Sequence, residues 1–224
     1  MLSFKNHKCV KTVKHIAIDL PHDLKRRQRG KRGGRKRKLH QHRKTPLPAL
    51  VFANARSINN KTDELASLIG RHCAFKNASA IGITESWLNG NIDDSLLNFD
   101  SFNTFWTDCD PKITWKRKDG GCQWLVNEQW CTNVTVHCQY CSKDLELLHL
   151  ECRPHYLPRE INIVNLILVY CVPGADNKSC VNISEDVIDQ CTIKHPDAAN
   201  IIVGDFNHVK LKYLNQYVDF PTRD

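Results

Sequence analysis

The chain of 224 residues lacks any apolar run that approaches the ~18 residues needed to span a bilayer. Its N-terminus, MLSFKNHKCVKTVKHIAIDL, also lacks the apolar core of a secretion signal, because lysines interrupt it. These two absences argue against a membrane protein and against a secreted one. We therefore expect a soluble, intracellular protein without a membrane partner.

Among the 11 cysteines, only Cys138 and Cys141 have the C-x-x-C spacing of a metal-binding pair. A structural zinc site normally needs two such pairs. The other cysteines are scattered, and many lie in apolar segments. In an intracellular protein they are expected to be reduced and to pack as small apolar side chains. A zinc ion at Cys138 and Cys141 is the less favoured alternative.

Residues 25–44 contain no acidic side chain but hold 12 of the 32 Lys and Arg residues. The rest of the chain then has 20 basic and 24 acidic side chains, a net charge of −4. Unbroken like charge and glycines oppose compaction, so residues 1–46 are expected to form a largely disordered arm. Such a run favours contact with nucleic-acid phosphates without base reading, or nuclear import. The candidate nucleic-acid-binding residues are Lys25, Arg26, Arg27, Arg29, Lys31, Arg32, Arg35, Lys36, Arg37 and Lys38.

After residue 46, short apolar runs alternate with two segments of helical periodicity. In the helical segment 60–72, Leu65, Leu68 and Ile69 share one face, with Asn60 or Thr62 as the expected cap. Buried strands followed by helices are typical of a layered α/β fold. Strands are predicted at 47–53, 78–83, 102–107, 122–126, 145–152, 161–170 and 200–203, and helices at 60–72 and 184–193.

Polar side chains stand at the ends of four predicted strands: Asn54, Glu85, Tyr170, and Asp205 with Asn207. In open α/β sheets, ligands bind at the carboxyl ends of the strands. Magnesium takes one or two protein carboxylates and completes its shell with water and phosphate oxygens. Amides and a phenol can hydrogen-bond phosphate without adding negative charge. Each residue alone also suits a turn, a helix cap or the core, so the prediction of a metal and phosphate site depends on the set.

The order of these motifs resembles the endonuclease/exonuclease/phosphatase superfamily. The segments ANARSINNKTDEL, ITESWL, VYCVPGAD and VGDFNH look like its successive motifs. The chain is most similar to the apurinic-type endonuclease domain of non-LTR (LINE-type) retrotransposons, which TPLPALVFANARS and GGCQWLVNEQWC also resemble. The resemblance covers roughly residues 47–224. It implies an α/β sandwich of two sheets flanked by helices, and Mg²⁺- or Mn²⁺-dependent hydrolysis of DNA phosphodiesters.

The resemblance also implies a role for each residue. Glu85 would be the principal metal ligand, and Asn54 would order the metal site and contact Asp205 or phosphate. Tyr170 would hydrogen-bond the scissile phosphate. Asp205 would orient or deprotonate the attacking water. Asn207 would donate to the charge that develops on the phosphoryl oxygens.

The sequence departs from the family pattern after Asn207, because no Ser-Asp-His follows. We therefore expect a domain of residues 47–224 without its C-terminal strands, with exposed sheet edges and impaired hydrolysis. One alternative is a non-catalytic nucleic-acid-binding remnant that acts through its basic arm. Another is a phosphatase of small phosphoesters such as inositol phosphates, against which the basic arm argues.

Overall fold

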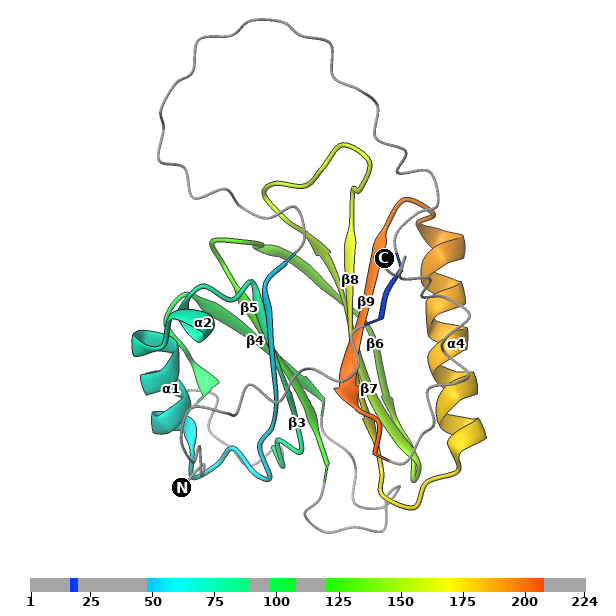
Figure 1. Ribbon diagram of the computed structural model, residues 1–224, viewed down its shortest axis with the longest axis horizontal. Helices are drawn as coiled ribbons and strands as arrows, with labels where there is room; N and C mark the ends of the chain where they lie inside the picture. Colours follow the sequence, from blue (N-terminus) through cyan, green and yellow to red (C-terminus); the bar gives the residue numbers. More distant parts are fainter. Residues whose placement is uncertain (1–16, 20–47, 89–96, 108–119, 208–224) are drawn as a thin grey trace, which may run out of the picture.

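The computed structural model describes residues 17–19, 48–88, 97–107 and 120–207, which form two β-sheets packed face to face with helices on the outside (Figure 1). This arrangement confirms the predicted two-sheet α/β sandwich. The four-stranded sheet has the order β2-β3-β5-β4. Its strands are β2 (Leu50–Asn54), β3 (Ala80–Thr84), β4 (Phe102–Thr107) and β5 (Cys122–Asn127).

The second sheet has five strands in the order β1-β9-β8-β7-β6. The pairs β8–β9 and β2–β3 are parallel, and the other pairs in both sheets are antiparallel. Each parallel pair brings the carboxyl ends of two strands to one edge of its sheet. The strands are β1 (Ala17–Asp19), β6 (Asn133–Cys141), β7 (Leu145–Arg153), β8 (Val164–Cys171) and β9 (Ala199–Asp205).

Helices cover the outer faces of both sheets (Figure 1). On the four-stranded sheet, α1 (Thr62–Arg71) buries Leu65 and Ile69, as its periodicity predicts, and α2 (Cys73–Lys76) follows. The expected cap is wrong, because Lys61 precedes α1 and makes no side-chain cap bond. On the five-stranded sheet lies α4 (Asn177–Lys194).

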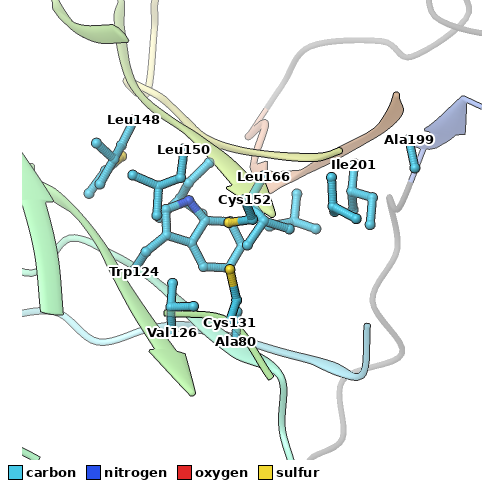
Figure 2. Packing of buried hydrophobic residues seen from close by; sticks show 14 of the residues in the cluster. Ala80, Trp124, Val126, Cys131, Leu148, Leu150, Cys152, Leu166, Ala199 and Ile201 are labelled. Carbon is cyan, nitrogen blue, oxygen red and sulfur yellow. The ribbon is translucent and has the colours of Figure 1, made fainter. Parts of the chain in front are cut away.

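The main core lies between the two sheets and surrounds Trp124 of β5, which is fully buried (Figure 2). The indole packs beside the sulfur atoms of Cys131 and Cys152 and among aliphatic side chains from β7 and β8 (Figure 2). These thiols pack as small apolar groups, as predicted. Two further apolar clusters join the sheets to α4 and to α1.

Two strands were not predicted from the sequence. Strand β6 is an edge strand whose residues are mostly exposed, so it has no apolar run to reveal it. Strand β1 lies within the arm 1–46 and pairs antiparallel with β9, opposite residues 200–202. Over those residues β9 is therefore not the open edge that we expected. The candidate nucleic-acid-binding residues from Lys25 to Lys38 lie outside the described residues.

The expectation of reduced cysteines is wrong at one position. Cys141 is disulfide-bonded, whereas eight other cysteines of the described part are free thiols. A disulfide sulfur is not the thiolate that zinc requires, which removes the alternative of a zinc ion held by Cys138 and Cys141. In the described ranges, no helix is both long and apolar enough to cross a bilayer.

Candidate metal and phosphate site

The side chain of Asn54 joins two carboxylates from different parts of the fold. Asn54 ends β2, Glu85 directly follows β3, and Asp205 ends β9. The Asn54 amide nitrogen donates to Glu85 Oε1 at 2.8 Å and to Asp205 Oδ2 at 2.9 Å. Since β2 and β9 belong to different sheets, this amide links the two sheets at one end of the sandwich. Asn54 is exposed and both carboxylates are only half-buried, so solvent can reach the group.

A glycine before Asp205 allows β9 to approach its neighbour closely. A Cβ atom on Gly204 would lie 1.9 Å from the carbonyl oxygen of Val169 in β8, so a larger residue does not fit. In the register of the sheet, Asp205 lies opposite Tyr170; this is the last pair between β8 and β9, one residue before the end of β8. The Gly-Asp sequence thus places the carboxylate beside Tyr170.

The backbone that carries Glu85 has an unusual conformation. Glu85 and Trp87 have φ values of 52° and 54°, in the left-handed region that residues other than glycine seldom adopt. Two hydrogen bonds from the segment after β2 support it: Ser57 N donates to Glu85 O at 2.8 Å, and Ile58 N donates to Ser86 O at 2.9 Å. Such conformations persist when surrounding contacts enforce them, and they are frequent at functional sites.

Tyr170 contributes a phenol that stays protonated. Burial raises the pKa of Tyr170, and the nearby carboxylates of Glu85, Glu146 and Asp205 raise it further. A neutral phenol has one hydrogen to donate, and at this position an anionic ligand can accept it.

Asn207 lies beside the group but already has partners. Its backbone N–H donates to Asp205 Oδ1 at 3.2 Å, and its side-chain nitrogen donates to the carbonyl oxygen of Cys171 at 2.5 Å. Only the second hydrogen of the amide is left for a ligand. The structure thus brings together Asn54, Glu85, Tyr170 and Asp205, with Asn207 at their margin.

The group contains more negative charge than its protein partners neutralise. The ion pairs in which both residues are described all involve Glu151, and none involves Glu85 or Asp205. The Asn54 amide binds both carboxylates without adding positive charge. No set of three or more His, Cys, Asp or Glu in the described ranges could hold a metal ion. A magnesium site on one or two carboxylates needs no such set.

One carboxylate beside this group was missed in the sequence. Glu146 is 1% exposed and lies opposite Tyr170 in the register of β7 and β8. Its side chain accepts a hydrogen bond from Gly121 N, which precedes β5. The segment LELLHLEC resembles any apolar strand with alternating polar residues, and no signal in it identifies a buried carboxylate.

No protein-family model matches the chain, and no curated protein matches it in sequence. Several solved structures resemble it. The 3′–5′ exonuclease NExo from Neisseria meningitidis is 15% identical with a TM-score of 0.47, over 70% of this chain and 57% of that one. Truncated TDP2 from Caenorhabditis elegans is 15% identical with a TM-score of 0.47, over 76% and 64%. The human Nocturnin catalytic domain is 12% identical with a TM-score of 0.46, over 73% and 64%. The chain thus spans less than two thirds of each of these proteins.

Proposed function

We propose that this chain is a divalent-metal-dependent phosphodiesterase domain that acts on DNA. The observation that carries the proposal is the link between Glu85 and Asp205 through the Asn54 amide. Two carboxylates from different sheets meet at an accessible position, and no basic side chain of the described part forms an ion pair with them. A bound cation would supply the missing positive charge.

The available donors suit Mg²⁺ or Mn²⁺, which prefer oxygen ligands. In the proposal, Glu85 is the principal ligand, and Asn54 orients it. The cation, when bound, would stabilise negative charge on phosphate oxygens. Sulfur and imidazole ligands are not part of the group, which argues against a zinc centre.

The roles of the remaining residues follow from their hydrogen bonds. Asp205 accepts from Asn54 and Asn207, so the orientation of its carboxylate is set for taking a proton from an attacking water. Tyr170 keeps its proton and would donate it in a hydrogen bond to the phosphate. Asn207 would use its second amide hydrogen on the phosphoryl oxygens.

The substrate class comes from the sequence. The basic segment 25–44 favours a polyanion over a small phosphoester, and the motifs resemble those of retrotransposon-type endonucleases. In this proposal, residues 47–224 form the endonuclease domain, and residues 1–46 form a DNA-binding arm in a nuclear protein.

The test uses the full chain with supercoiled plasmid DNA and Mn²⁺. We expect the chain to bind Mn²⁺ and to nick the plasmid, and we expect Glu85→Gln to abolish both. Glu160→Gln, at an exposed carboxylate of the loop before β8, is the matched control and should change neither. Mn²⁺ binding and nicking that persist unchanged in Glu85→Gln would refute the proposed site. DNA binding that survives EDTA and Glu85→Gln, without any nicking, would favour a binding function of the arm.

A further inference from the structure

Glu146 is a buried carboxylate to which the proposed reaction assigns no role. It is the second residue of β7, and it is 1% exposed. In the register of the five-stranded sheet, it lies opposite Tyr170, which in turn lies opposite Asp205. Burial of a carboxylate is costly unless polar groups of the protein satisfy it. The contacts of Glu146 therefore indicate what it does.

The carboxylate contacts the glycine pair that enters β5. Gly121 N donates to Glu146 Oε2. A Cβ atom on Gly120 would lie 2.0 Å from Glu146 Oε1, so the absence of a side chain at position 120 lets the carboxylate approach the backbone. Both glycines have positive φ, 111° and 91°, which favours glycine at each position. Glu146 and the glycine pair thus form one fitted unit.

The glycine pair is bonded to the loop that carries Glu85. Trp87 N donates to Gly120 O at 2.9 Å, and Ser86 N donates to Gly121 O at 3.2 Å. This loop has the left-handed φ values at Glu85 and Trp87 described above, which need enforcement by neighbours. One short path of hydrogen bonds therefore runs from the Glu146 carboxylate through Gly121 and Ser86 to the backbone of Glu85.

We propose that Glu146 is a positioning residue that fixes the Glu85 loop through the Gly120–Gly121 turn. The consequence for metal binding depends on the function proposed above, whereas the effect on the loop does not. Residues that orient a metal ligand from outside the coordination shell typically contribute ~10–100-fold to metal affinity or activity. Glu146 acts on the Glu85 loop from the other sheet, because β7 belongs to the five-stranded sheet and β3 to the four-stranded sheet.

The test compares three substitutions in the full chain. Glu146→Gln keeps an oxygen at the reach of Gly121 N, Glu146→Asp keeps the charge but shortens the side chain, and Glu146→Ala removes the acceptor. Hydrogen exchange of the amides of Ser86 and Trp87 reports on the loop, and a Mn²⁺ titration reports on the site. We expect Ala and Asp to speed the exchange of both amides about tenfold and to weaken Mn²⁺ binding about tenfold. Glu146→Gln should leave the exchange rates and the Mn²⁺ affinity close to those of the unchanged chain. Glu160→Ala should change neither quantity.

The two readouts separate this inference from the proposed function. Unchanged exchange at Ser86 and Trp87 in Glu146→Asp or Glu146→Ala would overturn the positioning role. Absence of Glu85-dependent Mn²⁺ binding in the unchanged chain would overturn the proposed function, and the exchange measurement would still decide the role of Glu146. If Glu146→Ala does not fold, the comparison of amide exchange in Glu146→Gln and Glu146→Asp decides the positioning role. Only Gln keeps the acceptor within reach of Gly121 N.

Discussion

Strands β7, β8 and β9 carry two rows of cross-strand polar neighbours, one on each face of the five-stranded sheet. The inner row, Glu146, Tyr170 and Asp205, faces the other sheet, as the core residues at alternate positions do. The outer row, Glu151, Asn165 and Asn200, faces α4. Each row has a carboxylate in β7, and the partners of the two rows differ.

In the outer row, polar groups and charges are matched. Glu151 accepts from Lys194 at 3.0 Å and from Arg153 at 3.1 Å, and His195 lies 3.3 Å away. The two asparagines are joined by a bond of 2.7 Å, and Asn165 also bonds His149 at 3.1 Å. This row joins the sheet to α4 and leaves no charge for a ligand to neutralise.

In the inner row, the carboxylate of Asp205 is linked to the carboxylate of Glu85 by hydrogen bonds from the uncharged amide of Asn54. The two rows show that the same three strands can support structure on one face and a candidate site on the other. The difference lies in the availability of positive charge. Glu151, which has cationic partners of its own, stabilises the fold, whereas Glu85 and Asp205, which form no ion pair, are suited to bind a cation.

The largest expected effects come from replacing one asparagine by alanine at the candidate site and one in the outer row. Asn54→Ala should slow DNA cleavage by about 10²-fold, because Glu85 and Asp205 lose the amide that orients both. Its free energy of unfolding should change by less than about 1 kcal/mol, since Asn54 is exposed. Plasmid nicking rates and urea denaturation measure the two quantities.

Asn165→Ala is the matched control for Asn54→Ala. Asn165 is buried, and its loss leaves polar atoms of His149 and Asn200 without their partner. We expect a destabilisation of about 2 kcal/mol and an unchanged nicking rate. Equal losses of stability from both substitutions, or equal losses of nicking rate, would remove the distinction between the rows.

A second prediction uses the pH dependence of the outer network. Burial lowers the pKa of His149 to about 4, against an ordinary value near 6.5. Between these values the unfolded chain binds a proton that the folded chain does not, so stability falls as the pH falls from about 6.5 towards 4. The full loss from this residue is about 3 kcal/mol. Chemical denaturation at several pH values measures it.

His149→Gln is the control for that pH dependence. The glutamine side chain cannot titrate but can still hydrogen-bond Asn165. The difference in the free energy of unfolding between the two proteins should therefore vary with pH between 6.5 and 4.5. Below about 4.5, protonation of Glu151 adds to the loss, because Lys194 and Arg153 lower the pKa of that carboxyl against the effect of burial. Parallel curves for the two proteins would show that folding does not shift the pKa of His149.

The difference between the rows also explains how much the sequence could predict. Asn54, Glu85 and Asp205 each follow an apolar strand, so their place at one end of the sandwich follows from the strand pattern together with the family resemblance. Glu146 could not be found in this way. It stands at the start of its strand, and its partner Gly121 lies 25 residues away, directly before β5 of the other sheet. The contact depends on how the sheets face each other, which no local pattern specifies.

The same limit applies to the elements that were missed or misplaced. Helix α4 begins seven residues before the predicted helix 184–193, where Asp176 caps it by accepting from Lys178 N. Its first three residues, Asn177, Lys178 and Ser179, are polar, so no apolar periodicity marks the start. Strand β1 pairs with β9 across more than 180 residues of sequence, and its pairing is a property of the assembled sheet.

The smallest expected effect concerns the cations of the outer row. Lys194→Ala removes one of three basic partners of Glu151, and the Lys194 side chain is 49% exposed. Because Arg153 and His195 remain, we expect a loss of about 0.5–1 kcal/mol that shrinks at high salt. Mn²⁺ affinity should not change, since Lys194 lies on the face opposite the site.

Lys178→Ala, at an exposed lysine in the first turn of the same helix, serves as the control for helix propensity and net charge. It should alter stability by less than about 0.5 kcal/mol. A loss above about 2 kcal/mol in Lys194→Ala would mean that Glu151 depends on this one cation. The outer carboxylate would then be as poorly compensated as those at the site, and local charge balance would no longer distinguish a structural row from a binding row.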